Sequence, residues 1–345
     1  MKPKVKKILS ISAGFVILII AAIGFGAYWV LYYPNFKPDK TKYIYIYEND
    51  KDFGRFCHEL KDSVQCVDIN TFRMLADFRE YPHNMKSGRY SVENGMSNME
   101  LLNKLRRSQQ TPIRLTFNNI RLITDLTERL SEQLMLNEDE LLSLIIDEDY
   151  CASLGFNITT ISAMFIPNTY EVYWNITAEK LMERMKREYD AFWTKDRLKK
   201  AENIRLTPIE VSILASVVEE ETAAADEYPV VAGLYINRLY KGMPLQADPT
   251  VKFAVGDFTL QRVLNKHLEI NSPYNTYIYS GLPPGPIRIP SPRSIDAVLN
   301  YTKHNYMYMC AKEDFSGRHS FAVTLSEHNR NANLYRAELN RRGIR

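Results

Sequence analysis

Three consecutive carboxylates, Glu219, Glu220 and Glu221, end an apolar stretch of this sequence. Upstream, Thr207-Pro208-Ile209-Glu210 has the pattern of a capping box with proline at the first helical position, so we expect a helix from there to about Thr222. At about 100° per residue, Glu221 points within about 15° of the mean direction of the apolar side chains. Glu219 points almost opposite and is expected to be solvated, whereas Glu220 lies near the edge of the apolar face.

A carboxylate on an apolar helix face is partly removed from water. Burial disfavours its charged form and raises its pKa toward the range that a general acid needs at neutral pH. Glu221 is therefore a candidate proton donor. The alternative is an ordinary run of solvated glutamates at a helix end, and the helix by itself does not separate the two. The elements that surround the helix must decide between them.

The N-terminal residues predict a membrane anchor. No charged residue occurs in 8–36, and Ile8 to Val30 is apolar enough to cross a bilayer. Lysines precede this stretch and aromatic residues end it, so we expect a cytoplasmic tail at 1–7, a transmembrane helix at 8–33 and all later residues on the outer side. A cleaved signal peptide is the alternative, although the apolar run is long for one.

The charge of the remaining chain is close to balanced. The formal net charge is +3, and setting aside the four lysines of the N-terminal tail leaves −1. Without a basic excess, the chain lacks the electrostatic attraction on which nucleic-acid binding depends. We therefore expect no nucleic-acid partner.

The cysteines and histidines do not form a metal-binding pattern. The four cysteines show no C-x-x-C spacing, and the six histidines include no H-E-x-x-H motif. We therefore expect neither a metal site nor a cofactor. An oxidising outer compartment would permit a disulfide between Cys57 and Cys66, and buried unpaired thiols are the equal alternative.

The fold class is predicted to be α+β, with a small module before a larger domain. Alternating strands near 43–47 and 87–92 enclose helices near 53–60 and 69–78, which gives a small α+β module over 41–110. A connecting α+β and helical region is expected next. It contains a strand, two amphipathic helices and a charged helical stretch expected to be a solvated connector, at 112–117, 122–134, 138–147 and 178–203.

Helices and polar loops follow the Glu221 helix. A second helix is predicted from Pro229 to Leu239, which places Asn237 near its C-terminal end. Three later loops combine prolines, glycines and short polar side chains, at Leu245–Thr250, Tyr274–Tyr277 and Gly281–Ile287. Such loops suit a carbohydrate groove, in which hydroxyls need oriented donors and acceptors, and they also suit ordinary turns.

Six ordered segments resemble the successive signatures of the membrane-anchored endolytic murein transglycosylases of the YceG-like family. These segments are Glu219–Thr222, Tyr235–Leu239, Gln246–Thr250, Tyr274–Tyr277, Gly281–Ile287 and His319–Phe321. The resemblance extends to the anchor, to Ser87–Tyr90 and to Phe165–Tyr170, so it spans nearly the whole chain. It implies a LysM-like module at 41–110, a connecting region at 111–205 and a catalytic transglycosylase region at 206–345.

The resemblance also implies a mechanism. The family's essential glutamate matches the second acid of its E-x-E-T motif, which is Glu221, the residue that the helix register also selects. Glu221 would act as acid and then base while the muramoyl C6 hydroxyl closes a 1,6-anhydro ring, so no water and no second carboxylate are needed. The residues expected to bind the sugars are Asn237, Gln246, Asp248, Tyr274, Asn275, Thr276 and His319.

Two other hypotheses for the function of the site stay open. If Asp248 lay within about 5 Å of Glu221, a retaining hydrolysis with two carboxylates would be arguable. A glycan-binding scaffold that holds peptidoglycan without cutting it is the alternative outside the enzyme class. The chain departs from the family pattern at Asn168, Ala247 and Arg318, and we expect these departures to affect substrate preference rather than chemistry.

The resemblance implies partners and a location as well. Peptidoglycan glycan strands are the expected substrate, and peptidoglycan synthases are candidate partners. The chain is expected in the bacterial cell (inner) membrane as a single-pass protein, with its C-terminal part outside the cytoplasm.

Overall fold

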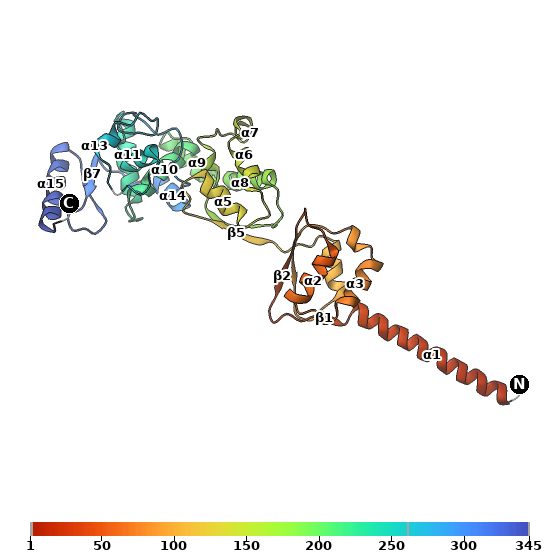
Figure 1. Cartoon of the computed structure of the whole chain (residues 1–345). Helices are drawn as coiled ribbons and strands as arrows, with labels where there is room; N and C mark the ends of the chain where they lie inside the picture. Colours follow the sequence, from red (N-terminus) through yellow and green to blue (C-terminus); the bar gives the residue numbers. More distant parts are fainter. Residues whose placement is uncertain (1–2, 261, 344–345) are drawn as a thin grey trace. The chain divides into compact units, whose positions relative to one another are not determined.

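The structure is a computed structural model that describes residues 3–260 and 262–343. Two compact units make up the chain (Figure 1). The first comprises Met1–Arg114 with Glu171–Ile176, and the second comprises Leu115–Tyr170 with Thr177–Arg345. Both mix helices and short strands, so the predicted α+β class is confirmed. Most of the region predicted as a connector lies in the same unit as the Glu221 helix.

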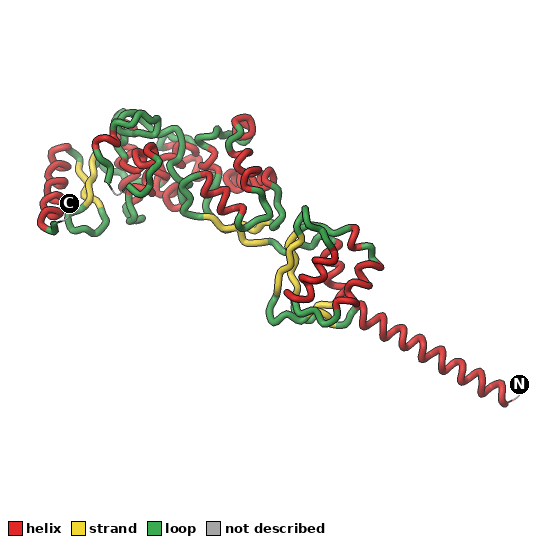
Figure 2. The backbone as a smooth tube through the Cα atoms, in the orientation of Figure 1, coloured by secondary structure: helices red, strands yellow, loops and turns green. Residues whose placement is uncertain are grey.

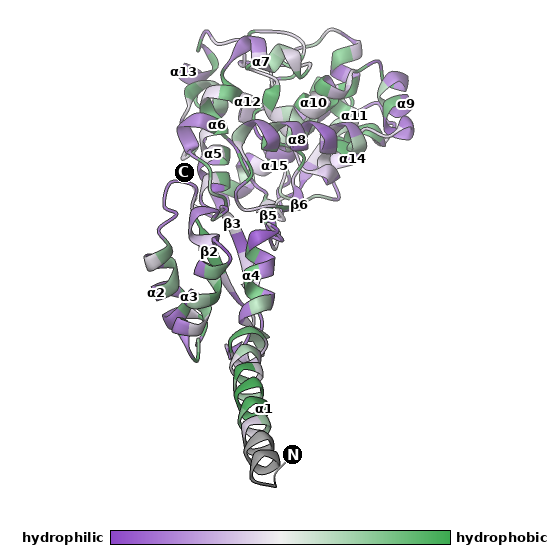
Figure 3. Ribbon diagram, turned by 90° about the vertical axis from the view of Figure 1, so that its right-hand side faces the viewer, coloured by the Kyte–Doolittle hydropathy of each residue, from purple (hydrophilic) through white to green (hydrophobic). Residues whose placement is uncertain are grey.

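The N-terminal helix α1 (Pro3–Leu31) is apolar over most of the part whose side chains are described (Figure 3). Its segment Ser12–Leu31 is the one helix among the described residues whose length and composition suffice to cross a membrane. Trp29 stacks on Tyr33 at this end, with ring centroids 3.9 Å apart. The helix is therefore compatible with the predicted membrane anchor. A signal sequence has the same length and composition, so that alternative stays open.

The first unit is built on two antiparallel strands that enclose two helices in sequence. Ile44 pairs with Tyr90 in this ladder, and both side chains are fully buried. A second pair of short strands and a third helix complete the unit. The elements are β1 (Pro34–Phe36), β2 (Lys42–Ile46), α2 (Phe53–Ser63), α3 (Ile69–Phe78), the 3₁₀ helix η1 (Tyr81–His83), β3 (Gly88–Val92), β4 (Met96–Ser97) and α4 (Asn98–Arg106). The predicted strands and helices of 41–110 are thus present within about three residues of their expected limits.

The core of the first unit is aromatic and aliphatic. Phe36, Phe72 and Tyr81 are fully buried, and Phe36 meets Phe72 edge to face at 5.9 Å. Cys57 is buried beside this core and Cys66 is half-buried, and both are free thiols. Of the two alternatives left by the sequence, the structure therefore has unpaired thiols.

The second unit consists mainly of helices joined by loops, as Figure 2 shows. Its helices are α5 (Ile123–Ser131), α6 (Glu138–Ile145), α7 (Glu148–Ser153), the 3₁₀ helix η2 (Ile161–Met164), α8 (Ala178–Phe192), α9 (Lys195–Asn203), α10 (Pro208–Glu221), α11 (Tyr228–Tyr240), α12 (Asp248–Val255), α13 (Asn265–Leu268), α14 (Pro292–Leu299) and α15 (Leu325–Arg341). Two strand pairs accompany them, β7 (Tyr308–Ala311) with β8 (His319–Ala322) and β5 (Ile113–Phe117) with β6 (Asn168–Val172). Residues 113–114 and 171–172 of the β5–β6 pair are assigned to the first unit.

Helix α10 lies at the centre of the second unit. All residues from Val211 to Val218 are buried, and the helix packs against α9, α11, α12 and α14. A helix that is apolar on every side is stable only inside such a bundle, because any exposed face would leave apolar surface in water. The end of α10 is therefore held by several neighbouring helices.

The charged stretch at 178–203 is not simply a solvated connector, and that prediction was wrong. It forms α8 and α9, and α8 buries one face through Leu181, Met185 and Tyr189. Residues four apart on a helix share a face, so the apolar positions form a stripe although most of the sequence around them is charged. The charged residues occupy the remaining surface.

Candidate active site

Glu221 is the last residue of α10. The Thr207 side chain and the Glu210 side chain form the expected capping box at the start of this helix, which sets its register. Glu221 Oε2 accepts a hydrogen bond of 2.9 Å from the Tyr235 hydroxyl. Tyr235 belongs to α11 and is only 1% exposed. The predicted helix is thus confirmed, and it brings Glu221 against a buried tyrosine.

The surroundings of Glu221 raise its pKa to about 7. Burial is the largest cause, because it removes water from the charged form, and the negative charge of Asp248 adds to it. The hydrogen bond from Tyr235 acts in the opposite direction, as do the positive charges of Arg238 and Lys252. The side chain therefore exchanges a proton near neutral pH, as a group that serves as both acid and base must.

Glu221 opens into a cleft with a volume of about 300 Å³. Of the residues predicted to bind sugars, Gln246, Asp248 and His319 line this cleft with it. The other lining residues are Leu234, Tyr235, Arg238, Leu245, Tyr277, Met309, Cys310 and Ala311. Helices α10, α11 and α12 and the β7–β8 hairpin thus each contribute to its walls.

Asp248 is fixed by a second tyrosine. The Tyr277 hydroxyl donates a hydrogen bond of 2.6 Å to Asp248 Oδ1. Burial and the neighbouring Asp248 charge raise the pKa of Tyr277 above its ordinary value, so it remains a neutral donor. The cleft therefore holds two carboxylates, Glu221 and Asp248, each hydrogen-bonded to its own tyrosine.

Gln246 is held by the buried cation Arg238. Arg238 Nη1 donates to the Leu245 carbonyl at 2.8 Å and to Gln246 Oε1 at 3.3 Å, while its Nε donates to the Met307 carbonyl at 2.7 Å. Gln246 itself has a left-handed backbone with φ of 49°. Arg238 thus ties α11 to the loop before α12 and to the start of the hairpin.

His319 is oriented by Glu227, which was not singled out from the sequence. Glu227 is 7% exposed, and its Oε2 lies 3.0 Å from His319 Nδ1 and 3.1 Å from the donating hydroxyl of Thr222. Because a carboxylate only accepts hydrogen bonds, Nδ1 carries the proton in this pair. Glu227 thereby links the residue after Glu221 to the opposite wall of the cleft.

The remaining predicted sugar-binding residues do not line the cleft. Asn237 donates its amide to the carbonyls of His304 and Tyr306. Asn275 donates to the carbonyls of Leu268 and Ile270, and the Thr276 hydroxyl accepts from the Ala247 amide at 3.1 Å. The Tyr274 ring packs on Phe253. Their role in sugar binding stays a prediction, and their contacts here support the loops.

Glu219 and Glu220 have partners within the protein. Glu219 accepts hydrogen bonds of 2.7 Å from the Ser291 amide and the Ser294 hydroxyl at the start of α14. Its side chain is only 13% exposed, so the prediction that Glu219 is solvated was wrong. A carboxylate is favourable there because the first amides of a helix lack partners.

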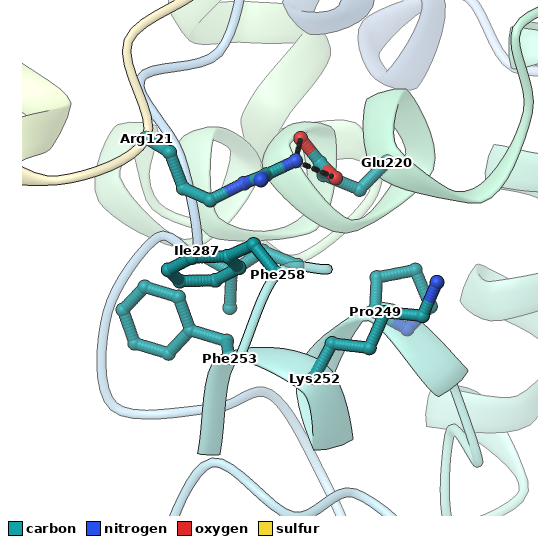
Figure 4. Close-up of a pocket in the computed structure, with 7 residues that line it drawn as sticks. All are labelled: Arg121, Glu220, Pro249, Lys252, Phe253, Phe258 and Ile287. Carbon is teal, nitrogen blue, oxygen red and sulfur yellow. Dashed lines mark hydrogen bonds and ion pairs between the residues drawn. The ribbon is translucent and has the colours of Figure 1, made fainter. Parts of the chain in front are cut away.

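Glu220 sits between two arginines. It accepts two hydrogen bonds from Arg121, at 2.7 and 2.9 Å (Figure 4), and one of 2.8 Å from Arg288. Arg288 also lies 3.5 Å from Glu219. These pairs leave Glu221 as the one member of the three that faces the cleft.

The loop at Gly281–Ile287 packs closely on the protein interior. A Cβ atom at Gly285 would lie 1.9 Å from the Thr159 carbonyl oxygen, so no other residue fits there without movement. The Ile287 amide donates to the Ser216 hydroxyl at 3.0 Å, which fixes the loop to α10. The glycines and prolines of this segment thus permit a close approach between backbones.

The three departures from the family pattern lie outside the cleft lining. Ala247 precedes α12 and offers no side-chain cap, Arg318 pairs with Asp226 at 2.8 Å, and Asn168 accepts from the Thr169 amide. Arg318 and Asp226 are both exposed, so water screens this pair.

Comparison with known proteins assigns the family. The YceG-like family matches residues 44–334. The chain is 45% identical over 122 residues to the endolytic murein transglycosylase of Bacillus subtilis strain 168, over 35% of this chain and 33% of that protein. It is 26% identical over 294 residues to the endolytic murein transglycosylase of Streptococcus pneumoniae serotype 2, over 75% of this chain and 52% of that protein.

A solved structure has the same fold. The crystal structure of a YceG-like protein from Listeria monocytogenes matches with a TM-score of 0.55 and 24% identity, covering 85% of this chain and 99% of that one. The chain spans only about a third to a half of the length of the curated relatives. The family match nevertheless extends from the first strand pair to α15, and the chain belongs to the YceG-like family.

Proposed function

We propose that this protein is a membrane-tethered lytic transglycosylase that cuts peptidoglycan strands internally between N-acetylmuramic acid and N-acetylglucosamine. The observation that carries the proposal is Glu221, a half-buried carboxylate with a pKa of about 7 that opens into a cleft. The relatives from B. subtilis and S. pneumoniae, which are endolytic murein transglycosylases, support the substrate and the reaction.

Glu221 performs both proton transfers in this reaction. Its proton goes to the glycosidic oxygen as the bond from muramoyl C1 breaks, and positive charge develops at C1. The resulting carboxylate then takes the proton of the muramoyl C6 hydroxyl, and that oxygen bonds to C1. Glu221 is protonated again at the end, and the product carries a 1,6-anhydro ring.

The neighbours of Glu221 divide the remaining tasks. Tyr235 stabilises the charged intermediate state of the carboxylate, because its hydroxyl donates to Oε2. Asp248 stabilises the positive charge that develops near C1. Gln246 and His319 offer hydrogen bonds to sugar hydroxyls and acetamido groups from two walls of the cleft. None of these tasks requires a second proton donor.

The first unit and α1 keep the active site near its substrate. Its β2–α2–α3–β3 order supports a LysM-like role, in which the module binds glycan strands. With the N-terminal lysines in the cytoplasm, α1 would place both units outside the cell (inner) membrane, where peptidoglycan synthases are candidate partners.

Mass analysis of digests of purified peptidoglycan tests the proposal. We expect anhydro-ended fragments from the wild-type chain and a loss of about 10²–10⁴-fold from Glu221→Gln, which keeps the shape of the side chain but cannot donate a proton. Glu202→Gln, at an exposed position of α9, is the matched control. Undiminished anhydro products from Glu221→Gln would refute the role of this residue.

The same digests separate transglycosylation from hydrolysis. Asp248 lines the cleft with Glu221, so a retaining hydrolysis with two carboxylates is the second candidate. Hydrolysis adds one water to each product, whereas anhydro-ring formation does not. Hydrated ends throughout the wild-type digest would favour the hydrolase, and binding without any cut would favour a scaffold.

A further inference from the structure

A second, smaller pocket flanks the cleft. It has a volume of about 70 Å³ and is lined by Arg121, Glu220, Pro249, Lys252, Phe253, Phe258 and Ile287. Figure 4 shows Arg121 and Glu220 on one side of this pocket and Lys252 and Phe253 on the other. None of the residues predicted to bind sugars lines it.

The pocket and the cleft share two helices. Helix α10 contributes Glu220 to the pocket and Glu221 to the cleft. Helix α12 contributes Lys252 to the pocket and Asp248 to the cleft, and residues four apart lie on the same face of a helix. The charge of Lys252 also acts on Glu221, whose pKa it lowers. Lys252 is therefore close enough to the cleft for its charge to act on a group bound there.

Lys252 has no partner of its own in the part of the chain that the structure describes. Among residues 3–260 and 262–343, no ion pair or hydrogen bond of its side chain is present. Glu220 is engaged by Arg121 and Arg288, and Asp248 accepts from Tyr277. Arg121 is neutralised by Glu220, so Lys252 is the positive charge of this pocket that is left to attract an anion.

The size and the walls of the pocket limit what can enter. The volume of the pocket, about 70 Å³, is far smaller than the volume of the cleft, about 300 Å³, so a small group such as a carboxylate suits the pocket better than a sugar ring does. The rings of Phe253 and Phe258 lie 6.2 Å apart and form an apolar wall. A small anionic group with an apolar neighbour, such as a methyl or methylene, satisfies both features.

We propose that Lys252 binds a carboxylate carried by the muramoyl unit of the substrate, and that this pocket distinguishes charged from neutral muramoyl substituents. The inference rests on the proposed function, because only a muramoyl residue at Glu221 brings such a group to the pocket. The carboxylate comes from the stem peptide, or from the lactyl group where the stem has been removed. Both sources have the same chemistry.

Cleavage of three substrates by the full chain tests this inference. The substrates are strands with free-acid stems, synthetic strands whose stems carry only carboxamides, and strands whose stems an amidase has removed. We expect Lys252→Met to raise KM about fivefold on the free-acid strands and to leave KM on the carboxamide strands unchanged, with Lys252→Arg close to wild type. A larger effect on the amidase-treated strands identifies the lactyl carboxylate as the group bound, and a larger effect on free-acid stems identifies the stem peptide.

The comparison between substrates removes the indirect effect of Lys252 on Glu221. Loss of this charge shifts the pKa of Glu221 equally for all three substrates, so only a change in their ratio supports the pocket. Lys266→Met, at an exposed position of α13, is the matched control. An equal loss on charged and neutral strands, or no loss on any, overturns the inference while the cutting activity itself stands. Absence of anhydro products from the wild-type chain would instead refute the proposed function.

Discussion

The hydroxyl of Tyr235 donates a hydrogen bond of 2.9 Å to Oε2 of Glu221. This contact favours the carboxylate form, whereas burial and the charge of Asp248 favour the protonated form. The opposing effects place the pKa of Glu221 at about 7 rather than higher. Tyr235 therefore sets how readily Glu221 takes a proton back as well as how it holds one.

The alkaline limb of the pH profile follows from this pKa. The free enzyme must carry a protonated Glu221, so kcat/KM is expected to fall tenfold per pH unit above an apparent pKa of about 7. Measurement of kcat/KM on soluble glycan strands between pH 5 and 9 checks the position of the limb. A profile that stays level to pH 9 would contradict the assignment of Glu221 as the acid.

Replacing Tyr235 with phenylalanine should move the limb to higher pH. Tyr235→Phe removes the donor that stabilises the carboxylate, so the pKa of Glu221 rises, while the buried ring is retained. At neutral pH we expect kcat to drop about tenfold. Without this hydrogen bond the carboxylate is less stable, so Glu221 donates its proton less readily. The pH profile separates this effect from misfolding, which would lower activity without shifting the limb.

Replacing Asp248 with asparagine should move the limb in the opposite direction. Asp248→Asn removes a negative charge that raises the pKa of Glu221, so the alkaline limb shifts toward lower pH. The amide can still accept from Tyr277. Because Asp248 also faces the positive charge at C1, kcat should fall at every pH together with this shift. If Asp248 were the nucleophile of a hydrolase, turnover would be lost and the wild-type products would carry hydrated ends.

The burial of Glu221 also makes stability depend on pH. Its pKa is about 7 in the folded chain and about 4.5 when unfolded, so the folded state holds the proton more tightly. The folded chain therefore loses stability as pH rises from about 4.5 to 7, by an amount on the order of 2–3 kcal/mol. Glu221→Gln should be more stable than wild type at pH 8 and similar at pH 4.

Thermal or urea unfolding of both chains at the two pH values measures this difference. The matched control is Glu202→Gln, because Glu202 is exposed. An equal change in the free energy of unfolding at pH 4 and pH 8 would mean that Glu221 is solvated in the folded state.

Glu227 should act as a positioning residue for His319. Glu227→Gln replaces the acceptor at 3.0 Å from Nδ1 by an amide that no longer fixes which nitrogen carries the proton. We expect kcat/KM to fall about tenfold, with little movement of the alkaline limb because the largest effects on the pKa of Glu221 come from burial, Tyr235 and Asp248. The ¹⁵N chemical shifts of the His319 ring report the tautomer directly, and an unchanged tautomer would contradict this role.

The sequence predicted the elements that carry local signals. Thr207 and Glu210 mark the start of α10, and the stretch Ile69–Phe78 was expected as a helix with the limits that α3 has. Local caps and periodicity are properties of neighbouring residues, so they can be read without knowing the fold. The α12, α14 and α15 helices and the β7–β8 hairpin were not predicted, because the sequence there was interpreted as loops and motifs.

The helix register selected Glu221 on an assumption that the structure does not bear out. It assumed that the helix has one apolar face, whereas α10 is buried on all sides from Val211 to Val218. Glu219 therefore lies in the interior too, and the two glutamates differ in their neighbours, an α14 N-terminus and the Tyr235 hydroxyl. Such tertiary partners are not encoded in the spacing of a single helix.

A similar limit applies to Asn237 and Tyr235. Both were visible in one motif, and only Asn237 was assigned to sugar binding. On α11 the two side chains point about 200° apart, and Tyr235 shares the cleft face with Arg238, three residues later. The i, i+3 spacing of Tyr235 and Arg238 indicates that the two side chains share a helix face. The sequence alone does not show that this face meets α10.

The three different partners of Glu219, Glu220 and Glu221 make the length of α10 a determinant of the chemistry. Each glutamate faces its partner only because the helix carries a fixed number of residues between its cap and its end. One residue inserted before Ser216 would rotate the end of α10 by about 100° and advance it by about 1.5 Å. Such an insertion would turn Glu221 away from the cleft and abolish proton donation, although all three glutamates would remain. Insertions and deletions within α10 should therefore be tolerated less well than substitutions in related sequences.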